Sequence, residues 1–313
     1  MSAAATAVPR PPRPRRLRSA RDFASRFSTR TDGIVGVAIL VVFAILALAP
    51  AFFVGPLENA VTASGAPLDP PSAAHVFGTD ELGRDMLNLT VHGARISMTI
   101  GLLATMITVV VGVGIGIISG FLGGRWDAFL MWLTDVFLVL PNLVLAIALA
   151  PILLDLVGDN AELLGIRATL LVIVVVIGLT SWATTARIIR SQVLSLKERA
   201  FVDRARVIGT GPGRIMRRHI LPNIINLIVA QAVLTFAYAV FTETSLSFIG
   251  LGDPFTPSWG QILNAAQEAG APGLLAWWYI APPAVCVVLV VVAFTLVGNA
   301  LDDVLNPKSA GRR

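Results

Sequence analysis

Six long apolar stretches, separated by shorter polar segments, set the pattern of this 313-residue chain. The stretches lie near Gly33–Phe53, Ile96–Phe121, Ala128–Leu153, Arg167–Ile189, Asn223–Phe248 and Trp278–Ala300. Each is long enough to cross a hydrocarbon core of about 30 Å as a helix that rises about 1.5 Å per residue. Because lipid offers the backbone no hydrogen-bond partners, each stretch is expected to be helical. The pattern therefore predicts an all-α polytopic membrane protein with six transmembrane helices.

The composition agrees with a membrane protein and disfavours several kinds of site. Hydrophobic residues make up 55% of the chain and charged residues 14%, whereas soluble domains are about a quarter charged. The single cysteine, Cys286, rules out an intramolecular disulfide and disfavours a Cys-ligated metal. His75 and His92 lie far apart in one loop and do not form a metal-ligand pattern. We expect no metal or other cofactor in this chain.

Basic residues flank the apolar stretches and predict the topology. Arg and Lys cluster before the first stretch, between the fourth and fifth, and at the C-terminus, and the net charge is +5. Under the positive-inside rule, both termini, the Gly123–Asp127 turn and the Arg187–Pro222 loop lie in the cytoplasm. The remaining loops, which carry most of the loop acids, then lie outside: Val54–Arg95, Asp155–Ile166 and Ile249–Trp277. Basic clusters beside membrane spans disfavour nucleic-acid binding, which a basic protein would otherwise suggest.

The polar, basic loop between the fourth and fifth stretches carries the most informative spacing. It reads Asp203-Arg204-Ala205, then Gly209 after three residues, then His219-Ile220-Leu221-Pro222. This spacing resembles the cytoplasmic EAA loop of ABC importer permeases, in which short coupling helices dock on a partner ATPase. Asp203 and Arg204 depart from the family's Glu-Ala, and His219 replaces Ile, as is typical of the peptide-transporter branch. The resemblance implies that the seven positions of the pattern contact the ATPase: Asp203, Arg204, Ala205, Gly209, His219, Leu221 and Pro222. We also expect Gly209 to form a sharp turn between two short helices, with Pro212 in the first turn of the second.

Two further blocks extend the resemblance. The segment from His75 to Arg95 reads HVFGTDELGRDMLNLTVHGAR and resembles a signature of the C-type subunit of oligopeptide and dipeptide permeases. The residues alone favour a solvated loop with a helix cap at Thr79 or Asp80. The block from Glu243 to Gly260 resembles another signature of the same subunit.

Two acidic residues near or within the predicted spans have open roles. Glu243, with Ser247 one turn later, lies at the end of the fifth span, and Asp135 lies in the third. Ionisable groups at membrane depth are costly and are often functional, so Glu243 and Asp135 are candidates for the solute pathway or its gate. Ser247, one turn from Glu243, is a third candidate. The alternative is a structural role for both acids. Glu243 would then accept bonds from nearby hydroxyls at a contact between helices, and Asp135 would act near the inner end of its span.

The glycines do not form a nucleotide site. Gly112, Gly114, Gly116 and Gly120 lie in the second span, where small residues let helices approach closely. The chain contains no GxxxxGK[ST] pattern, and we find neither a nucleophile–base pair nor a metal-ligand pair. We therefore expect a transport subunit that is not itself an enzyme. Trp277, Trp278 and Tyr279 are expected at the membrane interface.

The resemblance covers roughly residues 75–307 and implies the type I ABC importer permease fold. We divide the chain into a basic, Pro/Arg-rich tail (1–32) expected to be disordered, a first span with its outer loop (33–95), a permease core with its coupling loop (96–307, loop 191–222) and a second cytoplasmic tail (308–313).

The resemblance also implies a setting and partners. It places the chain in a bacterial inner membrane, as a heterodimer with a B-type permease subunit. Two cytoplasmic ATPases that bind ATP and Mg, an extracytoplasmic solute-binding protein and a peptide substrate complete the system.

Several alternatives stay open. The same subunit type also serves nickel chelates, glutathione and cell-wall peptides. A secondary transporter driven by an ion gradient would need ionisable groups at the midplane, for which only Asp135 and Glu243 are available.

Overall fold

The structure, a computed structural model, describes residues 27–158, 162–163 and 166–305 and forms a helical bundle. Its elements in chain order are α2 (Thr31–Leu48), α3 (Pro50–Val54), α4 (Met86–Leu122), α5 (Gly124–Val139), α6 (Asn142–Val157), the short antiparallel strands β1 (Glu162–Leu163) and β2 (Ile166–Arg167), α7 (Ala168–Lys197), α8 (Ala200–Val207), α9 (Pro212–Ile215), the π-helical segment η1 (Met216–Ile220), α10 (Leu221–Leu246), the π-helical segment η2 (Ser247–Leu251), α11 (Trp259–Glu268) and α12 (Trp277–Leu305). The tail expected over residues 1–32 lies outside the described residues as far as residue 26, and the tail over 308–313 lies wholly outside them.

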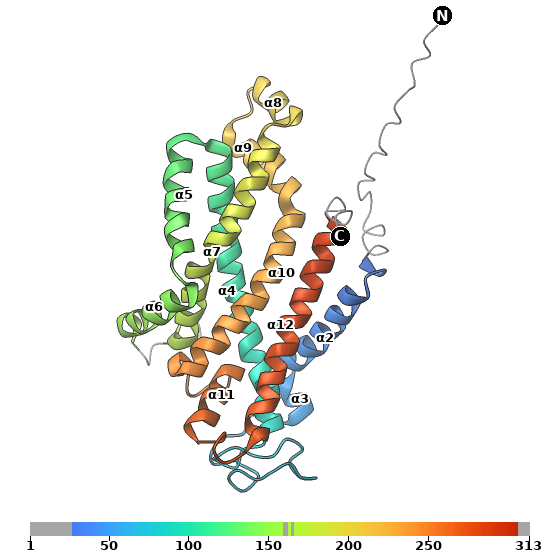
Figure 1. Ribbon diagram of the computed structural model, residues 1–313, viewed down its shortest axis with the longest axis vertical. Helices are drawn as coiled ribbons and strands as arrows, with labels where there is room; N and C mark the ends of the chain where they lie inside the picture. The colour runs from blue at the N-terminus through green and yellow to red at the C-terminus, as the bar shows by residue number, and fades with distance from the viewer. Residues whose placement is uncertain (1–26, 159–161, 164–165, 306–313) are drawn as a thin grey trace, which may run out of the picture.

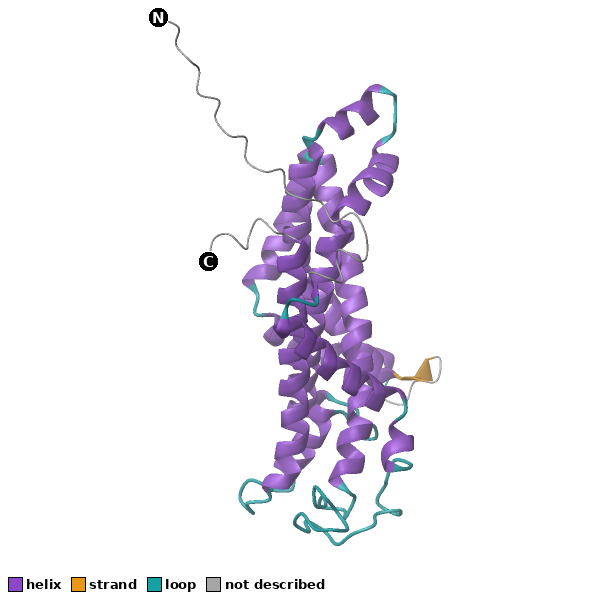
Figure 2. Cartoon of the chain, turned by 90° about the vertical axis from the view of Figure 1, so that its right-hand side faces the viewer, coloured by secondary structure: helices purple, strands orange, loops and turns teal. Residues whose placement is uncertain are grey.

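Long helices run side by side along the vertical axis shared by Figures 1 and 2. α4 and α7 form the most extensive helix pair, α10 packs on α4 and α12, and α2 packs on α12. The short helices α8 and α9 project beyond one end of the bundle, which we call the α8 end (Figure 1). The loop before α4 and the helix α11 close the opposite end, which we call the α11 end. The start of α2 and the last turns of α12 are joined by an ion pair, in which Arg30 Nη1 lies 2.7 Å from Asp303 Oδ2.

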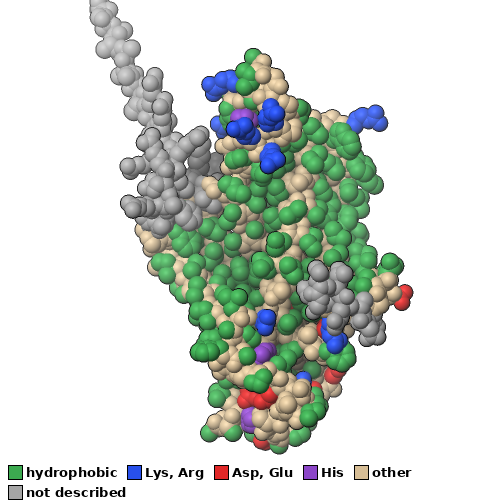
Figure 3. Space-filling model, turned by 180° about the vertical axis from the view of Figure 1, so that it is seen from behind, with side chains coloured by type: hydrophobic (Ala, Val, Ile, Leu, Met, Phe, Trp, Pro, Cys, Tyr) green, Lys and Arg blue, Asp and Glu red, His purple; other side chains and the backbone are tan. Residues whose placement is uncertain are grey.

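The number of apolar helices agrees with the predicted six spans. Among the described residues, five helical segments are long and apolar enough to cross a membrane, and counting the bent pair α5–α6 as one span gives six. Hydrophobic side chains cover the middle of the bundle in Figure 3, whereas Lys and Arg gather toward the α8 end and most Asp and Glu toward the α11 end.

The third span is broken rather than continuous. α5 and α6 meet at an angle of 94°, so the prediction of one helix over 128–153 was wrong (Figure 1). Pro141 explains the break, because proline has no N–H to donate and disfavours a helical conformation at the residue before it. Leu140 accordingly has an extended backbone, with φ −77° and ψ 128°.

Glycines bring α4 close to α7. A Cβ atom built on Gly112 would lie 2.8 Å from a backbone oxygen of α7, and the corresponding distances are 2.6 Å for Gly116 and 3.0 Å for Gly120. Larger side chains would force the two helices apart, so the predicted role in close packing is confirmed at these three positions. Gly114 has open space around it, and the same prediction was wrong there.

Helix α4 starts at Met86, well before the predicted span near Ile96. With 37 residues it is about 55 Å long, longer than a hydrocarbon core of about 30 Å. The Asp85 carboxylate caps it by accepting hydrogen bonds from the backbone N–H groups two and three residues later, at 2.7 and 3.0 Å. The alternative cap at Thr79 or Asp80 was wrong, because both residues are fully buried inside the preceding loop.

Long-range hydrogen bonds hold the α11 end together. Trp278 Nε1 donates to the carbonyl oxygen of Thr79 at 3.3 Å, and the Tyr279 hydroxyl donates to the Glu81 carboxylate. Trp259 Nε1 donates to the carbonyl oxygen of Thr90 at 3.0 Å. Tyr279 is fully buried, so the expectation that it anchors a membrane interface was wrong.

Candidate functional site

The segment between α7 and α10 folds into two short helices joined by a tight turn. α7 continues to Lys197, beyond the predicted end of the fourth span, so the linking segment begins at Glu198. α8 ends at Val207, and the predicted turn at Gly209 is confirmed by a φ of +78°, a conformation that glycine adopts at little cost. Pro212 occupies the first turn of α9, as predicted.

One face of this segment is fixed to the bundle by apolar packing. Val202, Ala205, Ile215 and Ile220 are buried together with residues of α4 and α7, namely Val113, Ile117, Phe121, Ile189 and Val193. The Arg206 guanidinium also lies 5.7 Å from the centre of the Phe121 ring, within the range of a cation–π contact. This continuous buried cluster holds the two short helices against α4 and α7.

The opposite face of the segment is open. Val207 is 87% exposed and Ile208 is 80% exposed, so two apolar side chains stand in solvent at the tip. Sequence reasoning did not select them, although they directly precede the Gly209 turn. Asp203 and Arg204 are also exposed, and Asp203 Oδ1 accepts a 3.2 Å hydrogen bond from Arg206 Nη1.

The remaining predicted residues lie where the segment meets α10. His219 is half-buried in η1 beside the Phe201 ring, with 6.4 Å between ring centres. Leu221 packs partly against the apolar cluster, and Pro222 is exposed in the first turn of α10. Pro222 also borders an open hollow lined by Arg214, Arg217 and Arg218. The seven predicted residues thus lie on one continuous segment, although Ala205 faces the bundle and the charged pair faces outward.

Two ion pairs tie α5 to α7. Arg190 Nε and Nη2 each lie 2.7 Å from the Asp127 carboxylate, which also accepts a 2.9 Å hydrogen bond from the Ser119 hydroxyl of α4. Asp135, a candidate pathway residue, pairs with Arg187 on α7 and is more than half exposed. The structure therefore gives Asp135 a contact between helices, at a different place from Glu243 and Ser247.

Glu243 is fully buried at the α11 end of α10. Its Oε1 atom accepts a 2.9 Å hydrogen bond from the Ser247 hydroxyl, and its Oε2 atom has no partner among the described residues. Neither Glu243 nor Ser247 lines the large cavity at this end, so the geometry favours the contact between helices over a gate.

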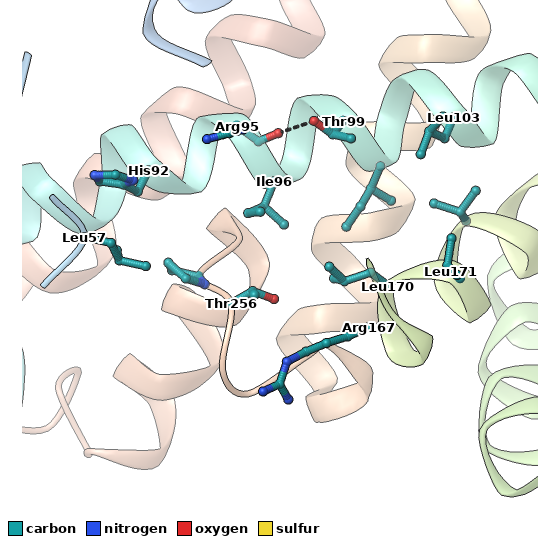
Figure 4. A pocket seen from close by; sticks show the side chains of 13 residues that line it. Leu57, His92, Arg95, Ile96, Thr99, Leu103, Arg167, Leu170, Leu171 and Thr256 are labelled. Carbon is teal, nitrogen blue, oxygen red and sulfur yellow. Dashed lines mark hydrogen bonds between the residues drawn. The ribbon is translucent and has the colours of Figure 1, made fainter. Parts of the chain in front are cut away.

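A cavity of about 650 Å³ opens between α4, the start of α7 and the loop before α11. Its lining is mostly apolar, and the side chains of Arg95, Arg167 and His92 stand around it (Figure 4). Arg167 Nε lies 3.7 Å from Asp253 Oδ2, and its guanidinium stacks over the Phe255 ring at 4.4 Å. Sequence reasoning missed the cavity, although Arg95 ends the first signature block.

The model of the family described as "Binding-protein-dependent transport system inner membrane component" matches residues 112–311, which include the whole segment between α7 and α10. The chain belongs to this family. It is therefore an integral inner-membrane protein of a binding-protein-dependent transport system.

Curated relatives match much of the chain. The dipeptide transport system permease protein DppC of Bacillus subtilis is 40% identical over 243 residues, covering 76% of this chain and 70% of the relative. The oligopeptide transport system permease protein OppC of the same organism is 35% identical over 293 residues, covering 92% and 89%. The di/tripeptide transport system permease protein DppC of Pseudomonas aeruginosa is 33% identical over 296 residues, covering 92% of each.

A solved structure supports the fold. A chain of the MetNI methionine ABC transporter in inward-facing conformations superposes with a TM-score of 0.54 at 19% identity, covering 71% of this chain and 97% of that chain. At this identity the likeness concerns the fold alone, and it confirms the predicted type I ABC importer permease fold.

Proposed function

We propose that this chain is the transmembrane subunit of an ATP-driven importer of dipeptides or oligopeptides and that it forms half of the translocation pathway. The observation that carries the proposal is the segment between α7 and α10, whose buried face is packed on the bundle and whose apolar tip is exposed. The peptide substrate is supported by the similarity to DppC and OppC proteins at 33–40% identity.

The proposed orientation puts the α8 end in the cytoplasm. Figure 3 supports it, since Lys and Arg gather toward this end and positive residues favour the cytoplasmic side. The ion pair between Arg30 and Asp303 holds the start of α2 beside the last turns of α12, which supports both termini being on the same, cytoplasmic side.

The proposed partners follow from this orientation. Two cytoplasmic ATPases bind ATP and Mg at the α8 end, a solute-binding protein docks at the α11 end, and a B-type permease subunit completes the pathway. In this arrangement the chain itself neither binds nor hydrolyses ATP. Asp203, Arg204, Gly209, His219, Leu221 and Pro222 would lie at or beside the ATPase contact, while Ala205 holds the segment to the bundle.

The physical basis of coupling is a rigid connection between two contacts. Val207 and Ile208 would enter an apolar groove of the ATPase, and burial of each side chain contributes about 1.5–3 kcal/mol. When the ATPases close on ATP, the tip moves with them, and the buried face transmits the movement to α4 and α7. A packed interface with two arrangements transmits such movement better than a flexible loop would.

The test is uptake by the complete complex in proteoliposomes. The complete complex should take up a radiolabelled dipeptide only when ATP is supplied. It contains the chain, its companion permease subunit, two ATPases and the binding protein. Glutathione and a nickel chelate serve as alternative cargoes, and an ATPase unable to hydrolyse ATP serves as the control. Uptake without ATP, or uptake of an alternative cargo in place of the dipeptide, would refute the proposed function.

A further inference from the structure

A second, smaller cavity lies at mid-depth in the bundle and is lined by polar side chains. It has a volume of about 200 Å³ and is bordered by Asn142, Ser181, Thr184, Thr185, Thr235 and Tyr238, with Leu234 as the apolar member. Asn142 follows the break between α5 and α6, whereas the other residues come from the middle of α7 and α10. The cavity has room for several water molecules at about 30 Å³ each.

The hydroxyls around this cavity differ from most other hydroxyls of the bundle, although Thr90 Oγ1 in α4 is also buried without a partner among the described residues. In a membrane helix, Ser and Thr commonly donate to the carbonyl oxygen one turn back, which satisfies the hydroxyl internally. Among the described residues, seven threonines do so at 2.7–2.9 Å: Thr99, Thr105, Thr134, Thr180, Thr242, Thr244 and Thr295. By contrast, the side chains of Ser181, Thr184, Thr185, Thr235 and Tyr238 have no hydrogen-bond partner among the described residues.

Ser181 shows the missing hydrogen bond most clearly. The residue is 7% exposed and borders the cavity, yet its hydroxyl oxygen is buried without a partner among the described residues. A buried polar group without a partner is costly, so such groups are rare in folded proteins, and a bound water or ligand is one way to satisfy them. Ser181, Thr184 and Thr185 recur at helical spacing and therefore share one side of α7. Thr184 is exposed and Tyr238 is 39% exposed, so the polar surface is open to a ligand.

We propose that this surface, centred on Ser181, Thr184 and Tyr238, is the mid-membrane contact of the translocation pathway for the amide groups of a peptide backbone. The inference rests on the proposed function and deepens it. The lining offers hydroxyl and amide groups that both donate and accept hydrogen bonds, and none of its residues carries a charge. Neutral groups of this kind match peptide N–H and C=O groups whatever the side chains, and they hold no charged solute tightly. Transport needs such contacts, which ease entry but still allow exit.

The transport test uses a variant that removes the hydroxyls and nearly keeps the shape: Ser181→Ala combined with Thr184→Val and Tyr238→Phe. In the complete complex, each lost hydrogen bond should slow passage about two- to tenfold. We expect the maximal rate of ATP-driven dipeptide uptake to fall at least about tenfold for the triple variant. The KM should stay unchanged, because the binding protein still captures the dipeptide. Thr180→Val is the matched control on the same helix, since its hydroxyl is bonded to Val176, and it should keep the wild-type rate.

The outcomes separate this inference from the proposed function. If the wild-type complex fails to take up the dipeptide, the proposed function fails. If the wild type transports and the triple variant matches it, the inference is refuted. If the triple variant no longer co-purifies with the companion permease subunit, the surface is a subunit interface, which also refutes the inference.

A second measurement needs no knowledge of the cargo. In a Cys286→Ala background, single cysteines are placed by Thr184→Cys and Tyr238→Cys, with Thr295→Cys on the exposed side of α12 as the control. A small hydrophilic thiol reagent should label the first two in the assembled complex and should leave the lipid-facing control unlabelled. Lack of labelling at Thr184→Cys and Tyr238→Cys, in both the presence and the absence of ATP, would overturn the proposed pathway surface.

Discussion

The conformation of Gly209 leads to a prediction with a matched control two residues away. Its φ of +78° is one that L-residues adopt at a cost, and for a β-branched residue the cost is about 1–3 kcal/mol. A Cβ atom built on Gly209 meets nothing within 4 Å, so Gly209→Val adds backbone strain without a collision. A cost of this size lowers the population of the native turn by about 5- to 150-fold.

The matched control is Gly211→Val. A Cβ atom at Gly211 also meets nothing within 4 Å, but the backbone there has φ −65° and ψ 154°. Valine adopts this conformation readily, and the following Pro212 favours it. Gly209→Asn is an intermediate case, because Asn tolerates positive φ better than other residues.

The assay measures ATP-driven uptake and ATPase co-purification on the same membranes. We expect Gly209→Val to abolish uptake, Gly209→Asn to retain part of it and Gly211→Val to retain nearly all of it. All three proteins should reach the membrane, since the strain is confined to an exposed turn. Wild-type uptake by Gly209→Val would show that this turn is not the coupling element. Equal loss in Gly211→Val would show that contact with the partner, rather than backbone strain, sets the effect.

Three further predictions concern the bundle, its orientation and its partners. Asp127→Asn weakens the bonds to Arg190, so it should lower the stability of the bundle by about 1–3 kcal/mol and lower the melting temperature in detergent. Asp203→Ala, at an exposed position, should leave the melting temperature unchanged. Equal melting temperatures for the two variants would contradict the stabilising role of the Asp127–Arg190 ion pair. A cysteine at the exposed position Ala66 should react with a membrane-impermeant thiol reagent added outside intact cells, and a cysteine at Ser195 should not. Strong labelling of Ser195 from outside would refute the proposed orientation. The purified chain alone should show no saturable ATP binding, and binding that persists after removal of contaminating ATPases would disprove the assignment of ATP to the partners.

The spans and the turn at Gly209 could be predicted from sequence because each depends on local chemistry. Apolar length predicts a spanning helix, and a glycine followed by a proline at short spacing predicts a turn between helices. The break at Pro141 also had a local signal, but the apolar run across it concealed the change of direction.

The partly polar surfaces could not be predicted in the same way. Whether a threonine bonds its own helix, as Thr180 does, or faces a cavity, as Thr184 does, depends on which neighbouring helix packs against it. The same holds for Arg95, whose position beside the large cavity follows from the packing of α4 and α7. The hydroxyl-rich run from Thr180 to Thr185 was a usable signal but not a distinctive one, because the run from Thr242 to Ser247 is equally rich in hydroxyls.

The hydrogen bonds that close the α11 end also determine when that end can fold. Trp278 and Tyr279 bond residues 199 and 198 positions earlier in the chain, Thr79 and Glu81. Because synthesis proceeds from the N-terminus, the loop before α4 has been made long before these partners exist. Contacts between such distant residues carry a loop-closure cost and form after local helices. The loop before α4 can therefore complete these hydrogen bonds only after the start of α12 has been synthesised.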